Sequence, residues 1–194
     1  MLLLAACAEK APQTEPKNIS VTDDAGRAVQ LTAPAQRVVS LMPTVTDLLI
    51  AMNAQDRLIA RTDFDTDQRL AHLPSLGGGL TPSIEWLVSQ KPDLVISWPD
   101  QGSRSLVNRL ASVNIPVYSA RSESIEDTHR ILKQIGELLG LQAKTDSLSN
   151  AIRLALDSVR SSTVNKPQVK VAYVVGVDPP MIAASGTFID ELIT

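Results

Sequence analysis

The sequence predicts an α/β fold with a mainly parallel sheet, followed by a long helix and the start of a second α/β lobe. Short apolar runs alternate with helical patterns from residue 37 to 140, which is typical of a parallel sheet covered on both faces. Residues 142–163 form one amphipathic stretch, about 30 Å long as a helix. A new apolar run begins after Pro167. We therefore expect a Rossmann-like N-terminal lobe, one long helix and an incomplete second lobe.

The N-terminal lobe is placed at residues 19–141. It opens with a hairpin, in which extended runs at 19–21 and 28–31 flank the turn sequence Asp-Asp-Ala-Gly. Buried strands are then expected from their length and apolar character at 38–41, 58–60, 94–97 and 115–118. In sheets of this kind, ligands bind beyond the carboxyl ends of the strands.

The first two helices of this lobe are predicted from their starting residues. Thr44 with Asp47 resembles a capping box, so one helix is expected to begin there. Thr81 is the expected cap of the next, with Pro82 at its first position, and this helix ends before Pro92.

A third helix is expected at 103–112, and Ser124 is expected to cap a fourth that Gly140 ends. The long helix at 142–163 follows. The C-terminal lobe, residues 168–194, would hold a strand at 169–175, a Pro-rich turn and a helical ending. So small a unit cannot form its own core. We expect that the chain is truncated at its C-terminus or that a partner supplies the rest.

Composition limits the function classes. The chain has 194 residues, 44% of them apolar, which is enough for one good core. A net charge of −3 argues against nucleic acid as a partner, because that needs a basic face. No apolar run approaches the length of a membrane-spanning helix.

We find no catalytic signature and expect neither an enzyme nor a metal site. The two histidines, His72 and His129, are far apart, and the glycines at 77–79 lack the Gly-Lys-Ser/Thr ending of a phosphate loop. The alternating acids at 63–67 lack the glycine and glutamate of a calcium loop, so we interpret them as solvated loop acids. Two alternatives stay open: an enzyme on the same scaffold, or a truncated relic that binds nothing.

Cys7 is the single cysteine, and Leu4-Ala5-Ala6-Cys7 resembles a bacterial lipobox. Acyl chains on Cys7 would anchor the protein to a membrane. We interpret residues 1–7 as a residual lipoprotein signal and 8–18 as a flexible linker. Only six residues precede Cys7 and none is basic, so we expect the true start to lie upstream or the chain to be a fragment. The alternative is an accidental start with a free thiol.

Four segments in this order resemble the class III substrate-binding proteins of ABC importers, the Fe/B12 periplasmic-binding domain, and the resemblance covers residues 18–194. The segments are 37–47, 73–85, 91–96 and 182–192. Residues 95–98, 122–126 and 176–180 look most like the cobalamin-binding branch. The resemblance implies two lobes joined by one long helix, with the ligand in the cleft between them.

That family captures bulky metal chelates outside the cytoplasmic membrane and delivers them to an ABC permease with its ATPase. The resemblance therefore implies a corrinoid such as vitamin B12, haem or a ferric siderophore as the ligand. It implies a monomer, located in the periplasm or lipid-anchored at the outer face of the cytoplasmic membrane of a bacterium, with no cofactor of its own. Glu85 would dock onto permease arginines, although a carboxylate near a helix N-terminus is also favourable in itself.

Trp98 is the leading candidate for ligand contact. It lies just past the strand at 94–97 and offers a flat apolar face and an N–H group; the alternative is a tryptophan that packs its own loop. Arg121 follows the fourth strand and could meet an anionic group or be solvated. The other candidates lie on loops expected to face the cleft: Pro43, Thr44, Asp63, Phe64, Gly79, Leu80 and Pro180.

Overall fold

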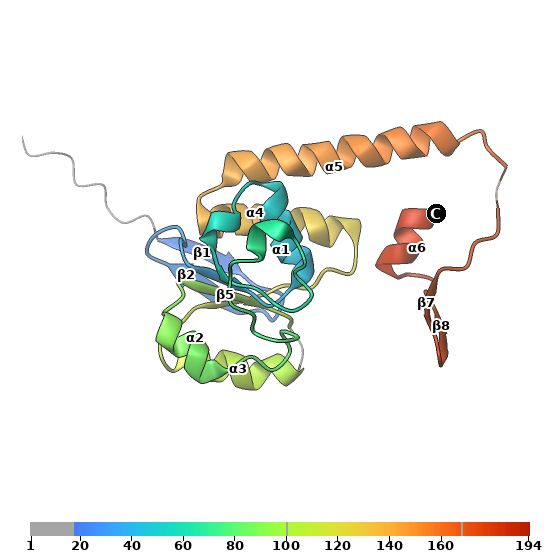
Figure 1. The fold of residues 1–194 in the computed structure, drawn as a ribbon. Helices are drawn as coiled ribbons and strands as arrows, with labels where there is room; N and C mark the ends of the chain where they lie inside the picture. Colours follow the sequence, from blue (N-terminus) through green and yellow to red (C-terminus); the bar gives the residue numbers. More distant parts are fainter. Residues whose placement is uncertain (1–17, 100, 168) are drawn as a thin grey trace, which may run out of the picture.

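The computed structural model describes residues 18–99, 101–167 and 169–194 (Figure 1). Cys7 and the expected linker up to residue 17 lie outside these residues. In chain order the elements are β1 (Ile19–Thr22), β2 (Ala28–Leu31), β3 (Val38–Ser40), α1 (Pro43–Ala51), η1 (Gln55–Arg57), β4 (Leu58–Ala60), η2 (Gln68–Leu70), α2 (Ile84–Gln90), β5 (Leu94–Ser97), α3 (Gln101–Ala111), β6 (Val117–Ser119), α4 (Ile125–Leu139), α5 (Gln142–Thr163), β7 (Val174–Val177), β8 (Pro180–Ile182) and α6 (Phe188–Ile193).

The central sheet has four strands in the order β4-β3-β5-β6, and every pairing in it is parallel. The chain runs from β3 out to β4 and then crosses back to β5 on the other side of β3. The strand order therefore reverses between β3 and β5. In open α/β sheets this reversal opens a crevice at the carboxyl ends of the two strands. The predicted fold class, a mainly parallel α/β sheet, is confirmed.

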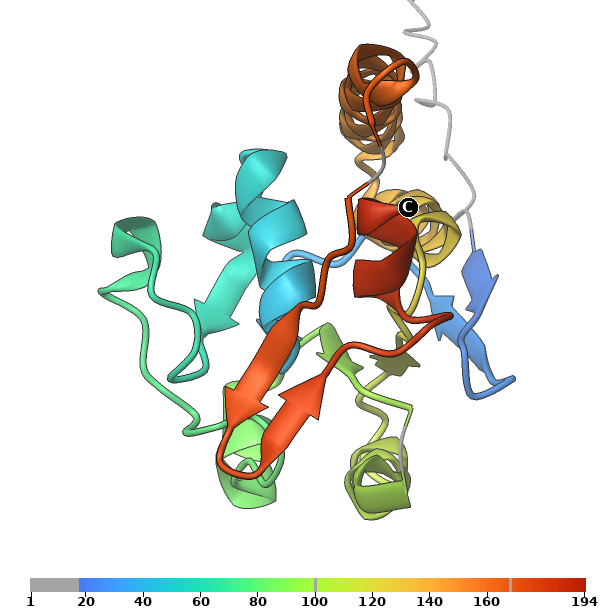
Figure 2. The same ribbon diagram turned by 90° about the vertical axis from the view of Figure 1, so that its right-hand side faces the viewer.

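Both faces of this sheet are covered, because successive side chains of a strand point to opposite faces. Val38, Ile96 and Tyr118 belong to one core cluster, which includes side chains of α1 and α4. Their neighbours in sequence pack on α2 and α3 on the other face: these are Val39, Val95 and Val117. Figure 2 shows the helices on the two sides of the strands.

The hairpin of β1 and β2 forms a separate antiparallel pair and was predicted correctly. Val21, Val29 and Leu31 point from it into the core cluster on the α4 side. The buried Asp23 carboxylate closes the turn by accepting the N–H groups of Ala25 and Arg27 at 3.0 and 2.8 Å. The hairpin is therefore packed onto the lobe and not a loose extension of it.

Two predicted helix starts are wrong. Met42 precedes α1, with Pro43 at the first position, so Thr44 already lies inside the helix and makes no cap. The cap of α2 is Ser83, which accepts the Trp86 N–H at 3.2 Å. Thr81 was predicted as the cap because Thr and Ser are both common caps and Pro is common in the first turn. The sequence alone does not show which of the neighbouring residues is the cap.

The other helix boundaries agree well with the sequence. Ser124 accepts the Asp127 N–H at 3.0 Å, and Gly140 ends α4 in the left-handed region with φ of +68°. The helix predicted at 103–112 is α3, which begins at Gln101. The connecting helix α5 has the predicted bounds, Gln142–Thr163.

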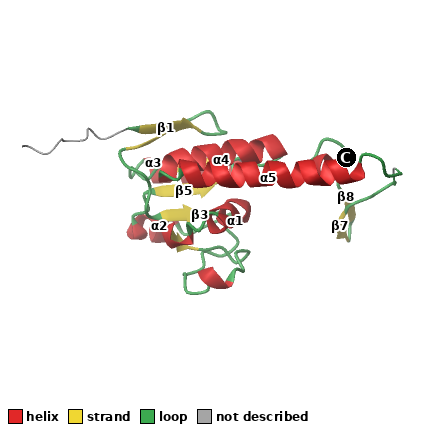
Figure 3. Ribbon diagram, turned by 90° about the horizontal axis from the view of Figure 1, so that it is seen from above, coloured by secondary structure: helices red, strands yellow, loops and turns green. Residues whose placement is uncertain are grey.

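Helix α5 packs on α4 along its first half and then projects beyond the lobe (Figures 1 and 3). Leu148 and Ile152 lie against the core cluster, whereas Leu154 and Val159 are exposed. The two helices approach closely at Gly136, where an added Cβ would collide with the Thr145 hydroxyl. No helix among the described residues has both the length and the apolar character to span a membrane.

The second unit consists of the antiparallel β7–β8 hairpin and α6. The strand predicted at 169–175 in fact begins at Val174. Its register pairs Val174 to Val177 with β8, which has only three residues. Most apolar side chains of the second unit are exposed, Val177 and Ile182 among them.

Candidate functional site

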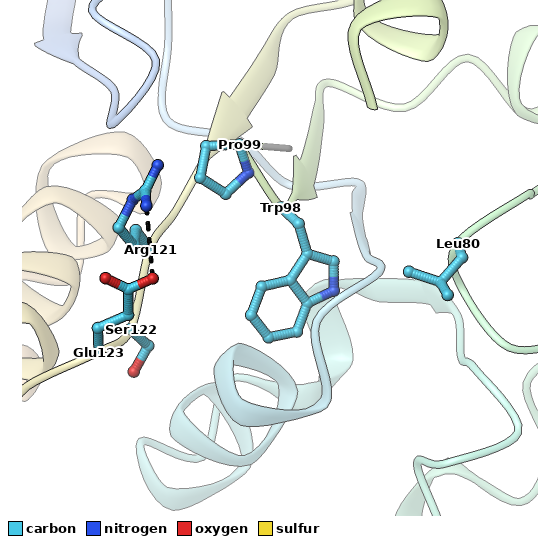
Figure 4. Close-up of a pocket in the computed structure, with 6 residues that line it drawn as sticks. All are labelled: Leu80, Trp98, Pro99, Arg121, Ser122 and Glu123. Carbon is cyan, nitrogen blue, oxygen red and sulfur yellow. Dashed lines mark hydrogen bonds and ion pairs between the residues drawn. The ribbon is translucent and has the colours of Figure 1, made fainter. Parts of the chain in front are cut away.

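A pocket of about 260 Å³ lies beyond the carboxyl ends of β5 and β6 (Figure 4). Residues that follow three strands line it. Trp98 and Pro99 follow β5, and Leu80 comes from the loop between β4 and α2. The segment 121–123, which follows β6, completes it. The pocket therefore lies at the edge of the sheet where the topology favours ligand binding.

Trp98 is the central side chain of this pocket. Its indole lies between Leu80 and the segment 121–123 (Figure 4). It is half-buried and packs partly against the core cluster on the α1 and α4 side. Packing holds one part of the ring while another part faces the pocket. Such a ring offers a rigid, flat apolar surface to a ligand.

The opposite side of the pocket carries charge. The Arg121 guanidinium pairs with the Glu123 carboxylate at 3.4 Å, and the side chains are 52% and 69% exposed. An ion pair this exposed contributes little stability and is readily exchanged for another partner. Arg121 can therefore turn to an anionic group of a ligand at small cost.

Leu80 and Gly79 were predicted together, but their settings differ. The Leu80 side chain is 70% exposed at the rim of the pocket. Gly79 is buried with φ of +80°, and a Cβ there would lie 2.9 Å from the carbonyl oxygen of Leu41. Glycine is required at this position because the loop passes close to the end of β3.

The remaining predicted contacts do not line this pocket. Pro43 and Thr44 were expected on a loop, but they form the first turn of α1. Phe64 is exposed on the loop after β4, and the neighbouring Asp63 accepts a hydrogen bond from the Ser75 hydroxyl. Pro180 is exposed at the start of β8, in a strand and not in a loop.

The alternating acids at 63–67 each accept a hydrogen bond. Asp65 was expected to be solvated, but it is buried, and it accepts hydrogen bonds from the Thr62 N–H and hydroxyl at 2.6 and 2.8 Å. Hydrogen bonds from Arg69 lower the pKa of Asp67 to about 2. Partial burial, together with the charges of Asp65 and Asp67, raises the pKa of Asp47. Within the described residues, no three His, Cys, Asp or Glu side chains are grouped to hold a metal ion.

Three pocket residues were missed by the sequence reasoning: Pro99, Ser122 and Glu123. Each is next in sequence to a predicted contact or separated from one by a single residue. The signal that could have found them is position alone, because all follow the carboxyl end of a buried parallel strand. Trp98 and Arg121 were predicted from the chemistry of their side chains, which their neighbours on the same loops do not share.

Glu85, the predicted docking residue, lies in the first turn of α2 and outside the pocket. Its carboxylate accepts a hydrogen bond from the Arg109 guanidinium of α3 at 3.1 Å, and its side chain is 78% exposed. A hydrogen bond from its own backbone N–H, together with Arg109, lowers the pKa of Glu85. The residue is thus a charged surface group with an exchangeable partner.

Comparison with known proteins gives the family. A family model described as periplasmic binding protein matches residues 38–194. An uncharacterized ABC transporter substrate-binding lipoprotein of Bacillus subtilis is 24% identical over 99% of this chain and 66% of its own length. The vitamin B12-binding protein of Vibrio vulnificus is 26% identical over 79% of this chain and 56% of its own length.

The fold comparison agrees with that result. The crystal structure of the periplasmic vitamin B12 binding protein of Vibrio cholerae superposes with a TM-score of 0.70 at 21% identity, over 82% of this chain and 64% of that protein. This chain spans between about half and two thirds of the length of the curated relatives that it matches. Since the family model covers most of the sequence, the chain belongs to the periplasmic binding protein family.

Proposed function

We propose that this chain is the solute-binding component of an ABC importer and captures a bulky metal chelate, namely a corrinoid, haem or a ferric siderophore. The observation that carries the proposal is the pocket, which sets the Trp98 indole opposite the exposed Arg121 guanidinium at the carboxyl edge of a parallel sheet. Family membership supports a binding role and not a catalytic one.

The chemistry of the pocket suits a flat solute with a charged edge. A macrocycle or catecholate ring would lie on the indole face, and a carboxylate or phosphate would take the place of Glu123 beside Arg121. The volume of about 260 Å³ is below the range of about 300–1,000 Å³ for complete ligand pockets. The pocket would therefore contact only one side of such a ligand.

The second unit is the candidate for the facing wall. Seen from the side toward which α5 projects, the β7–β8 hairpin and α6 lie in front of the N-terminal lobe (Figures 1 and 2). Pro180, predicted as a ligand contact, is exposed on this hairpin. A ligand held between the two units would be recognised by shape and a few polar contacts and released unchanged.

Delivery of the ligand to the permease would depend on Glu85 at the surface and on Cys7 near the N-terminus. Glu85 would leave Arg109 for arginines of the permease, whose ATPase drives import, because exposed pairs exchange readily. A lipid on Cys7 would hold the protein at the outer face of the membrane. In this proposal the protein acts as a monomer and needs no cofactor.

Tryptophan fluorescence tests the binding proposal, because the chain has two tryptophans. Trp98 lines the pocket, whereas Trp86 packs on the α2 and α3 side of the sheet. The chain and its Trp86→Phe and Trp98→Phe variants are titrated with cyanocobalamin, haemin and ferrichrome. We expect saturable quenching by one probe in the parent and in Trp86→Phe, and loss of that signal in Trp98→Phe. Quenching that survives in Trp98→Phe, or that no probe produces, contradicts the proposal.

A further inference from the structure

The last residue of β6 and the segment after it, which lines the pocket, are held at alternate backbone amides by carboxylates. Three N–H groups donate to three acidic side chains: Ser119 to Asp23 at 3.2 Å, Arg121 to Asp24 at 2.6 Å, and Glu123 to Asp127 at 3.0 Å. Since β6 is an edge strand, its outer amides have no neighbouring strand in the sheet that the described residues form. The carboxylates provide the acceptors that a neighbouring strand would otherwise supply, at the two-residue spacing of an extended chain.

Asp24 joins this segment to both the hairpin turn and helix α4. Its backbone N–H donates to the Ser119 carbonyl at 2.9 Å, and its Oδ2 accepts the Arg121 N–H. Its Oδ1 pairs with the guanidinium of Arg130 in α4. Arg130 in turn donates to the Arg121 carbonyl at 3.1 Å and to Asp127 at 2.7 Å. Both the N–H and the C=O of Arg121 are thus held, one by Asp24 and the other through Arg130.

The pairs that Arg130 makes with Asp24 and Asp127 are shielded more than an ordinary surface pair. The Asp24 side chain is 16% exposed and that of Arg130 is 33% exposed, whereas the Arg121–Glu123 pair at the pocket is more than half exposed on both sides. Partly buried, charge-assisted hydrogen bonds are stronger than neutral ones and fix geometry as well. The backbone of the segment is therefore anchored while its pocket-facing side chains stay free to exchange partners.

We propose that Asp24 is a positioning residue of the ligand pocket, which fixes the backbone of residues 121–123 directly and through Arg130. Asp24 itself does not line the pocket. Its role would be to order the binding segment before the ligand arrives, so that binding does not have to order it. The inference rests on the proposed function for its consequence in binding, but the anchoring itself is measurable without a ligand.

The first experiment measures amide hydrogen exchange in the full chain without a ligand. In Asp24→Ala we expect the Arg121 amide to exchange about tenfold faster, which corresponds to the loss of one hydrogen bond to a charged group. Asp24→Asn retains an acceptor for that amide but loses the ionic pair with Arg130, so it should give a smaller change. Unchanged exchange at Arg121 in Asp24→Ala overturns the proposal.

Asp67→Ala is the matched control. Asp67 also accepts a backbone N–H, from Arg69 at 2.8 Å, and forms an ion pair with the guanidinium of Arg69, but it lies outside the pocket. Its removal should leave the exchange of Arg121 unchanged. Amides of the central strand β5 report whether each variant is folded. If Asp24→Ala does not fold, Arg130→Gln removes the guanidinium that links Asp24 and Asp127 to the Arg121 carbonyl, leaves both carboxylates in place, and should still accelerate exchange in the segment; no change at Arg121 and Glu123 then overturns the proposal.

The second experiment measures affinity for whichever of cyanocobalamin, haemin or ferrichrome quenches the parent protein. Asp24→Ala should bind that probe about tenfold more weakly, and Asp67→Ala should bind it as the parent does. Faster exchange with unchanged affinity overturns the role in the pocket. If no probe binds the parent, the proposed function fails, and the exchange data alone decide whether Asp24 anchors the segment.

A double variant shows whether Asp24 and Arg130 act on Arg121 jointly or independently. Because Asp24 and Arg130 hold opposite sides of the same residue, their removal should not be additive. In the double variant Asp24→Ala, Arg130→Gln, the loss of affinity should be less than the product of the two single losses. Independent, multiplicative losses contradict a joint action on Arg121.

Discussion

The carboxylate of Glu191 in α6 accepts a hydrogen bond from the backbone N–H of Ile125, the first residue of α4, at 2.8 Å. This contact joins the second unit to the N-terminal lobe. It occupies a position that favours negative charge, since the first N–H groups of a helix have no partner within the helix. Ser124 caps the same helix through the Asp127 N–H, so the two acceptors serve different amides.

Replacing Glu191 with alanine should release the Ile125 amide. We expect its hydrogen exchange to become about tenfold faster, as for loss of one hydrogen bond to a charged acceptor. The Asp127 amide, which Ser124 holds, should keep its rate and is the internal control. Equal acceleration at both amides would show that the helix start as a whole had frayed, and would contradict a specific contact.

Gly136→Ala should destabilise the protein where α4 meets α5. The new Cβ would collide with the Thr145 hydroxyl and lie 3.1 and 3.2 Å from its Cγ2 and Cβ, so rotation of that side chain gives no relief. Overpacking costs about 1–3 kcal/mol, which outweighs a gain in helix propensity of at most about 1 kcal/mol. Urea unfolding measures the difference.

Two further variants control for this effect. Gly78→Ala meets only the Phe64 ring, at 3.6 Å, and should be close to neutral. Adding Thr145→Ala to Gly136→Ala removes the colliding hydroxyl, so the double variant should be more stable than the sum of the single changes predicts. Strict additivity would rule out the collision as the cause.

Glu85→Ala should separate delivery from binding. Because Glu85 is exposed and lies outside the pocket, the affinity for whichever probe quenches the parent protein should be unchanged, whereas stimulation of a cognate transporter in vesicles should fall. Arg109→Ala frees the same carboxylate and should preserve stimulation. Parallel loss of affinity and stimulation in Glu85→Ala would count against a docking role.

Asp127 should make the pocket segment sensitive to acid. Partial burial by itself would raise the pKa of Asp127, but the hydrogen bonds from Arg130 and from the Glu123 N–H outweigh it, and the pKa is lowered. A lowered folded pKa means that the stabilisation is fully present above the unfolded value of about 3.9 and disappears as the pH falls through the folded pKa. The difference in unfolding free energy between the parent and Asp127→Asn should therefore be constant above about pH 5 and shrink below about pH 4. A difference that persists at the lowest pH would contradict this assignment.

Much of the fold could be predicted because it depends on local patterns. Helix α5 has a continuous amphipathic pattern after Gly140, and both of its predicted ends are correct. The start of α2 was placed too early because Thr81, Pro82 and Ser83 are all acceptable near a helix start, and only the structure selects Ser83. The start of β7 depends on its short partner β8, which an apolar run does not reveal.

The pocket could be predicted only in part, for a similar reason. Position after a buried strand is a local property, and it led to Trp98 and Arg121, which the structure places in one pocket. The contacts of Asp24 with Arg121 and Arg130 join residues about a hundred positions apart in the chain. Nothing in the turn sequence indicates which strand end the hairpin will reach, so this relationship emerges only from the folded chain.

The place of the β1–β2 hairpin affects how the protein should be trimmed for laboratory work. The family match begins at Val38, whereas Asp23 and Asp24 precede it. A recombinant version cut to the matched region would retain Trp98 and Arg121, yet the outer amides of Ser119 and Arg121 would lose their acceptors. Weak binding by such a trimmed protein would reflect the deleted turn and not the identity of the solute, so expression should start upstream of Ile19.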